Sequence, residues 1–186
     1  MADIHLALQE LFKAEFNNKP ELFLHKNSGE STHTIGGVYR KANPTGIDWY
    51  FVTKILSVCD EDMKRASKML YYDAKTMNEV VEVFKKNYWL PLHLDRVESQ
   101  KIATEIFLFS VLTGVRNGSK LAQKTVGAVQ DGLIGLKTLE ALNNYNESDF
   151  DKDFDKLEIE HFENLVDKRP EFERFLAGWK SRSYLV

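Results

Sequence analysis

The sequence predicts a mainly α fold with one small β-hairpin near residues 30–40, and three observations support this prediction. Apolar residues recur at helical spacing through most of the chain. That periodicity stops over residues 22–44, "LFLHKNSGESTHTIGGVYRKANP". This stretch contains the strand-forming run "THTIGGVY", in which Gly36 and Gly37 can form the turn. A hairpin is only marginally stable alone, so we expect it to lean on the helices.

The first half of the chain is expected to form four amphipathic helices. Apolar side chains repeat every three or four positions in residues 3–16, 47–58, 60–70 and 76–89. Asp48 stands at the start of the second helix, where an N-cap belongs. Thr76 and Glu79 have the spacing of a capping box, which predicts that the fourth helix starts there.

The second half is expected to be helical as well. Residues 98–115 are the most apolar stretch and predict a central, buried helix. Ser119 is predicted to cap the next helix. The stretch "QDGLIG" is predicted to form a turn before a short helix over residues 136–144. Two further helices are expected over residues 150–166 and 171–182, and Pro170 suits the start of the last one. Trp179 lies on its apolar stripe, which predicts a core or interhelical aromatic.

Composition excludes several classes of function. The chain has 186 residues, 25 basic and 28 acidic side chains and a net charge of −3, so it has no electrostatic footprint for nucleic acid. The single cysteine, Cys59, excludes an internal disulfide and a thiolate metal site, and we expect it to be buried. The five histidines show no H-x-x-x-H spacing and no nucleotide-binding motif is present, so neither zinc nor another cofactor is expected.

The sequence also gives expectations about location. The N-terminal residues lack a basic region followed by an apolar run, so they do not resemble a Sec signal peptide. No segment approaches the roughly 18 consecutive apolar residues of a membrane span. We therefore expect cytoplasmic synthesis without a Sec signal and no membrane insertion.

A carboxylate is the remaining candidate for chemistry. Glu30 stands among Gly, Ser and Thr next to helical regions, where partial desolvation raises a carboxyl pKa and allows general-acid catalysis. The neighbouring Asn27, Ser31, Thr32 and Thr34 suit sugar hydroxyls and acetamido groups. The same residues are ordinary in surface loops, so composition alone leaves a catalytic and a purely structural role open.

Two later stretches, "LFSVLTGVRNGSKLAQKTVGAVQDGLIGLKTLEALN" and "FLAGWKSR", carry a resemblance. They resemble glycoside hydrolase family 108, the phage and prophage N-acetylmuramidases with a predicted peptidoglycan-binding region. The matching positions are Gly114, Gln123, Gly127, Asp131-Gly132-Leu133-Ile134-Gly135, Thr138, Gly178-Trp179 and Arg182. We expect mainly structural roles for Asp131 and Gly132 in a turn, for Ile134 as its anchor and for Thr138 in the next helix.

Near the N-terminus the resemblance is partial. Thr34-Ile35-Gly36-Gly37-Val38 matches the family's Thr-x-x-Gly-Ile, whereas "LHKNSGES" stands where the family has Glu-Gly-Gly-Tyr. Glu30 is then the acid available in a shortened loop. The resemblance implies a lysozyme-like catalytic part over residues 1–95 and a helical part resembling a peptidoglycan-binding region over residues 96–186, packed as one unit.

The activity implied by the resemblance is that of an endolysin-type muramidase, a glycoside hydrolase. It would cleave the β-1,4 bond between N-acetylmuramic acid and N-acetylglucosamine, with Glu30 as catalytic acid. Asn27, Thr34, Tyr39 and Trp49 are the predicted substrate-binding residues, although the two aromatics could equally pack the hairpin onto the helices.

The resemblance also implies partners and an alternative. Asp48 is the nearest second carboxylate in the sequence, but capping suits it better. The implied partner is the glycan strand of peptidoglycan, with no metal, cofactor or obligate protein partner, reached after release or export by an unidentified route. The alternative is a non-catalytic peptidoglycan-binding or secretion-related module that has lost the acid.

Overall fold

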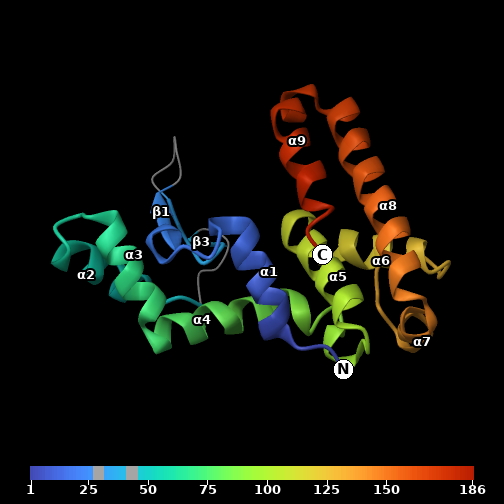
Figure 1. Ribbon diagram of the computed structural model, residues 1–186, viewed down its shortest axis with the longest axis horizontal. Coiled ribbons are helices and arrows are strands. Elements are labelled where there is room, and N and C mark those ends of the chain that lie inside the picture. Colours follow the sequence, from blue (N-terminus) through green and yellow to red (C-terminus); the bar gives the residue numbers. More distant parts are fainter. Residues whose placement is uncertain (27–31, 41–45) are drawn as a thin grey trace. The chain divides into compact units, whose positions relative to one another are not determined.

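The structure, a computed structural model, describes residues 1–26, 32–40 and 46–186 (Figure 1). The chain divides into two compact units. The N-terminal unit comprises Leu11–Lys86, and the C-terminal unit comprises Met1–Glu10 together with Asn87–Val186. Helices predominate in both units, which confirms the predicted mainly α fold.

The N-terminal unit contains a small antiparallel sheet in the strand order β1-β2-β3. Its strands are β1 (Leu24–Lys26), β2 (His33–Ile35) and β3 (Val38–Tyr39). The predicted hairpin corresponds to β2 and β3, which turn at Gly36 (φ +52°) and Gly37 (φ +84°). A side chain at position 36 would be strained for a second reason, because its Cβ would lie 2.7 Å from the Phe23 ring.

The strand β1 was not predicted from the sequence. A helix-borne side chain holds this strand: the Leu24 N–H donates to Ser67 Oγ at 2.9 Å, and the Ser67 hydroxyl donates to the Pro20 carbonyl at 2.5 Å. Ser67 lies in the middle of α3 (Met63–Tyr72). The sheet therefore leans on a helix, as the hairpin's marginal intrinsic stability requires.

Aspartates begin the three helices that follow the sheet. Asp48 caps α2 (Trp49–Val58), Asp62 caps α3, and Asp73 caps α4 (Ala74–Phe84). The predicted capping box at Thr76 and Glu79 is wrong, because Asp73 accepts both the backbone N–H and the hydroxyl of Thr76. Thr76 thus lies in the first turn of α4, and the N-cap, Asp73, stands three residues before the predicted cap.

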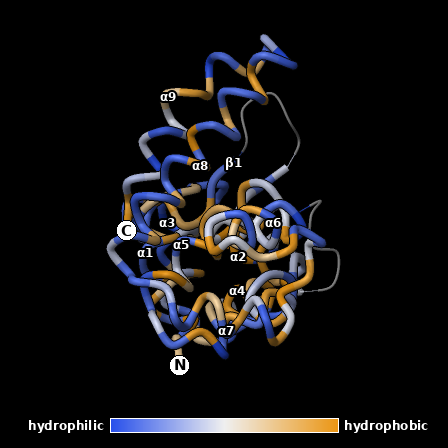
Figure 2. Tube along the Cα trace, turned by 90° about the vertical axis from the view of Figure 1, so that its right-hand side faces the viewer, coloured by the Kyte–Doolittle hydropathy of each residue, from blue (hydrophilic) through white to orange (hydrophobic). Residues whose placement is uncertain are grey.

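Among the described residues, the C-terminal unit contains the first part of α1 (Ile4–Phe16) and five complete α-helices. The five are α5 (Gln100–Thr113), α6 (Val115–Thr125), α7 (Leu136–Asn144), α8 (Glu147–Lys168) and α9 (Glu173–Arg182). Side chains of α5 are buried over most of its length, which confirms the predicted buried helix. Hydrophilic and hydrophobic segments alternate along α8 and α9, as in amphipathic helices (Figure 2).

The start of α6 differs from the prediction. The helix begins at Val115, directly after Gly114 (φ +94°), so Ser119 lies inside it and does not cap it. Gly118 allows the close approach of α5, because a Cβ there would lie 1.7 Å from Ser110 Oγ and 2.9 Å from Ser110 Cβ. This glycine therefore serves helix packing, at the expense of helix propensity.

Aromatic side chains fill the space between α5, α8 and α9. Phe109 packs edge-on against Phe154 and Phe162, and Trp179 stacks on Phe162 at 5.0 Å between ring centroids. The prediction of Trp179 as an interhelical aromatic is confirmed. Cys59, in the other unit, is buried as expected. Among the described residues, no helix combines the length and apolar character that crossing a membrane requires.

Candidate functional site

The structure shows three of the five predicted site residues. Asn27 and Glu30 lie outside the described residues. Thr34, in the middle of β2, is 0% exposed and pairs in register with Tyr39 of β3, which is 50% exposed. Trp49 is the first residue of α2. The burial of Thr34 suits a role in holding the turn of the hairpin, and the substrate-binding assignments stay predictions.

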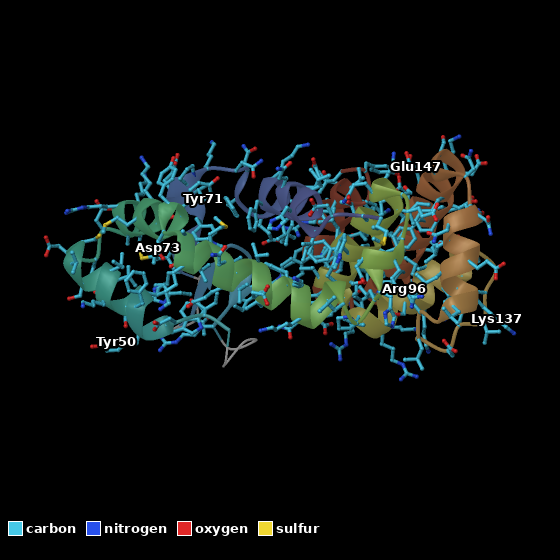
Figure 3. All side chains as sticks on the ribbon, turned by 90° about the horizontal axis from the view of Figure 1, so that it is seen from below. Tyr50, Tyr71, Asp73, Arg96, Lys137 and Glu147 are labelled. Carbon is cyan, nitrogen blue, oxygen red and sulfur yellow. The ribbon has the colours of Figure 1, made fainter. Side chains whose placement is uncertain are left out.

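The Trp49 side chain is half-buried, and its one polar atom makes no hydrogen bond to the described residues. Its Nε1 is buried and has no hydrogen-bond acceptor among the described residues. The guanidinium carbon of Arg40 lies 5.9 Å from the ring centroid, a cation–π distance. The next residue, Tyr50, is 81% exposed at the start of α2 (Figure 3). Aromatic surface and a cationic group are thus close to the predicted hairpin.

Asp48 serves as the N-cap of α2, as its position predicted. Its carboxylate accepts from the Phe51 N–H at 3.0 Å and from Lys75 Nζ at 2.9 Å. Both donors, the ammonium first, hold the pKa of Asp48 below its ordinary value. Its own N–H donates to Glu79 at 2.9 Å. Asp48 is therefore an ionised, structurally engaged carboxylate.

A groove of about 420 Å³ lies between α6 and α8 in the C-terminal unit. Polar side chains of both helices line it, together with one residue of the turn after α6. The lining residues are Asn117, Lys120, Leu121, Lys124, Gln130, Leu157, Glu160, His161, Asn164 and Lys168. Side-chain amides and ammonium groups therefore dominate its walls.

The electrostatics of the groove favour anions. Three lysines face one glutamate, and only Lys124 is paired with it, at 3.5 Å from Glu160. No described carboxylate lies within ion-pair distance of Lys120 or Lys168. Burial, and secondarily the Lys168 charge, lowers the pKa of His161, so this imidazole is neutral near pH 7. The groove thus combines positive charge with neutral hydrogen-bonding groups.

The turn that carries Gln130 is held by Gln123 of α6. The Gln123 amide donates to Asp131 Oδ1 at 2.7 Å and to the Leu133 carbonyl at 2.9 Å, and its oxygen accepts from the Gly132 N–H at 2.9 Å. Gly132 has φ +84°, and Ile134 is buried below the turn. The structural roles predicted for Asp131, Gly132 and Ile134 are confirmed, and Gln123 fixes one end of the groove.

Sequence reasoning missed the lysines of the groove. A pattern existed, because Lys120 and Lys124 are four residues apart, as are Glu160, Asn164 and Lys168, so each set shares a helix face. Such stripes are also typical of any solvated helix surface. Only the pairing of α6 with α8 brings the two faces together.

Comparisons with known proteins relate this region to peptidoglycan. Residues 117–184 match the family described as "Predicted Peptidoglycan domain". Every residue lining the groove falls within that match. A comparison with curated protein sequences returns no match. The family match supports the predicted relation to peptidoglycan proteins.

Among solved structures, Brucella abortus SagA is similar over nearly the whole chain. The TM-score is 0.63 at 20% sequence identity, covering 96% of this chain and 88% of SagA. At this identity the likeness shows a shared fold.

Proposed function

We propose that this chain binds peptidoglycan through the groove between α6 and α8 and cleaves its glycan strands as an N-acetylmuramidase. One observation carries the first part: a groove lined by three lysines lies wholly within the residues matched to a peptidoglycan domain. The second part rests on the resemblance of the Thr34–Val38 hairpin and its neighbouring Glu30 to a muramidase active-site loop.

The chemistry of the groove fits peptidoglycan fragments. Peptide stems of the polymer carry free carboxylates, which the ammonium groups of Lys120 and Lys168 can pair with. Its sugars carry acetamido groups, whose N–H and carbonyl suit the side-chain amides of Asn117, Gln130 and Asn164. Leu121 and Leu157 offer small apolar contacts between these polar groups. Binding of this type weakens as salt screens the charges.

For cleavage, Glu30 is the proposed general acid. A protonated carboxyl would donate to the leaving glycosidic oxygen as the sugar becomes oxocarbenium-like. Asp48 is a poor second carboxylate, because Phe51 and Lys75 already occupy its oxygens. The exposed ring of Tyr39 offers a flat surface of the kind that sugar rings pack against.

The two parts of the proposal are tested with two sets of variants on purified cell walls. Glu30→Gln is expected to abolish muropeptide release and to leave co-sedimentation with walls unchanged. Lys120→Glu combined with Lys168→Glu is expected to reduce co-sedimentation at least tenfold. Lys137→Glu, which makes the charge change of one of these two substitutions on α7 outside the groove (Figure 3), is the control and should bind normally.

Each result separates the proposal from its alternative. A parent protein that sediments with walls but releases no muropeptides would favour the non-catalytic binding module. Equal loss of binding in Lys137→Glu and in the groove variant would contradict the groove as the binding site.

A further inference from the structure

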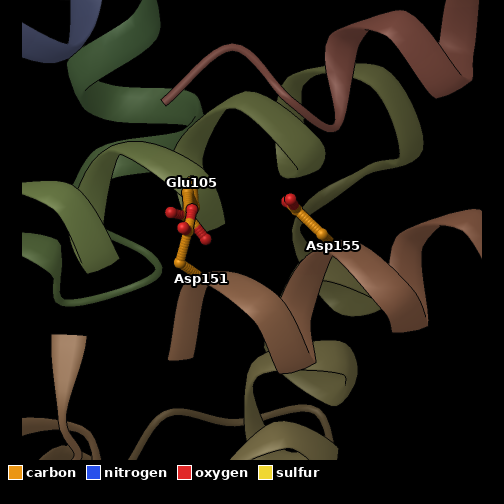
Figure 4. A group of neighbouring side chains, drawn as sticks. All are labelled: Glu105, Asp151 and Asp155. Atoms are coloured by element: carbon orange, nitrogen blue, oxygen red, sulfur yellow. The ribbon is translucent and has the colours of Figure 1, made fainter. Parts of the chain in front are cut away.

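Three carboxylates converge between α5 and α8, away from the groove. They belong to Glu105 of α5 and to Asp151 and Asp155 of α8, and one oxygen of each lies within 4.8 Å of the other two. Figure 4 shows the carboxylates of Glu105 and Asp151 facing each other, with Asp155 one turn further along α8. Both helices belong to the C-terminal unit, so the cluster forms within one unit.

Glu105 points into this cluster, where its carboxyl faces a second acid, Asp151. Its side chain is only 6% exposed, and neither carboxylate oxygen has a hydrogen-bond partner among the described residues. A buried carboxylate that lacks a donor is strongly destabilising unless a positive charge or a proton satisfies it. In the ion-free protein a proton on Glu105 satisfies these oxygens, because burial and the neighbouring Asp151 raise the pKa of Glu105 to about 9. A cation bound between the three carboxylates would displace that proton and take up both oxygens.

The surrounding charges do not compensate the cluster. On α5, Lys101 pairs with Asp151 at 3.0 Å. On α8, Glu158 lies beside Asp155 but is mostly protonated near pH 7, because burial raises its pKa to about 8, and Glu147 lies near Lys101. One ammonium thus faces three carboxylates, and the net negative charge that remains when all three are ionised would be neutralised by one divalent cation.

We propose that Glu105, Asp151 and Asp155 bind one calcium ion, which ties α5 to α8. Oxygen ligands select hard cations, and Ca²⁺ takes its oxygens at about 2.3–2.6 Å, so it can bridge oxygens up to about 4.6–5.2 Å apart. Mg²⁺, with oxygens at about 2.0–2.1 Å, would need a tighter cluster. Asp151 and Asp155 are partly exposed, so water can complete the coordination.

The test is a titration of the full-length protein with calcium in the absence of peptidoglycan. Calorimetry measures the binding, and thermal unfolding measures the change in stability. The parent is expected to bind one Ca²⁺ with a dissociation constant of about 10⁻⁴–10⁻³ M and to unfold at a higher temperature when it is saturated. Asp155→Asn and Asp151→Asn should each weaken binding at least about tenfold. Lys101→Met, which removes the competing ammonium, should tighten it.

Asp167→Asn, an equal charge change at an exposed position of the same helix, is the control and should bind like the parent. A folded parent that binds no Ca²⁺ overturns the proposal without any variant. Equal affinity in Asp155→Asn and the parent overturns the ligand set, and tighter binding of Mg²⁺ than of Ca²⁺ overturns the choice of ion. None of these readouts depends on muramidase activity or wall binding.

Discussion

At the scale of single residues, Gln123 shows how one amide organises a turn eight residues away. Both its donor and acceptor sides are used, and the bonds to Asp131 and Gly132 leave the turn little freedom. The turn itself was predictable, because Asp-Gly favours a residue with positive φ. The part played by Gln123 was not, because it depends on where the last turn of α6 lies in space.

Gln123→Glu should destabilise the protein near neutral pH. The new carboxylate would face Asp131 Oδ1, where the Gln123 amide now donates at 2.7 Å, so an attraction becomes a repulsion. We expect a loss of about 1–3 kcal/mol in the free energy of unfolding at pH 7.5. The repulsion raises the pKa of the new glutamate, so the lost stability should return as the pH falls towards 4.

Urea unfolding at the two pH values measures this effect. Gln130→Glu makes the same charge change at an exposed side chain and should unfold like the parent at both. An equal loss at both pH values in Gln123→Glu would show that lost packing, rather than charge, is responsible.

At the scale of helices, caps determine where a helix begins and small residues determine how closely two helices pack, and apolar periodicity reveals neither. The residue ranges of the helices were largely predictable, because each buries one stripe of side chains. The predicted start of α4 was wrong because the side chains of both Asp73 and Thr76 can cap a helix. In the structure the cap is Asp73, which accepts from the Thr76 N–H. The start of α6 was mistaken because Gly114 allows a helix to begin immediately after another has ended.

Gly118→Ala should destabilise the packing of α5 on α6. Alanine favours helix by about 1 kcal/mol over glycine, yet the added Cβ would lie 2.9 Å from Ser110 Cβ, which no rotation of the hydroxyl relieves. We expect a net loss of about 1–3 kcal/mol in the free energy of unfolding.

Gly178→Ala in α9 provides the comparison for this helix effect. Among the described residues, no atom outside the helix's own backbone lies within 4 Å of the added Cβ there, so the propensity gain should remain and raise the unfolding temperature slightly. Thermal unfolding of both variants by circular dichroism checks the pair. A stabilised Gly118→Ala would contradict the close contact.

At the scale of the whole molecule, the predictions from sequence were strongest for fold class and weakest for site. Helical periodicity is a property of one segment, so it can be recognised locally. The strand β1 spans only three residues and depends on Ser67 of α3, and the groove depends on the pairing of α6 with α8. Those features arise from contacts distant in sequence, which no local pattern contains.

Stability of the molecule should also depend on pH through Glu158, a buried residue of α8. Burial raises the pKa of Glu158 from 4.5 to about 8, partly opposed by a hydrogen bond from Ser183. A carboxyl pKa raised by folding contributes stability below pH 4.5 that is lost as the pH rises towards 8. The loss from this residue approaches about 1.4 kcal/mol per pH unit within that range.

Glu158→Gln should flatten this dependence. The variant is expected to match the parent near pH 4.5 and to unfold at higher denaturant concentration than the parent near pH 8. Guanidinium unfolding across this pH range measures the difference. Glu171→Gln, at an exposed position before α9, is the control and should keep the parent's slope. Parallel profiles for the parent and Glu158→Gln would contradict the raised pKa.

The contact between Gly118 and Ser110 also restricts how this protein can evolve. The two positions share the space for one side chain, so the effect of a substitution at either depends on the residue at the other. With glycine at position 110, the nearest remaining atom to a new Cβ at position 118 is the residue 110 Cα, at an ordinary 3.4 Å. Alanine at position 118 should therefore be tolerated only after Ser110 has become glycine, which makes the order of these two mutations matter.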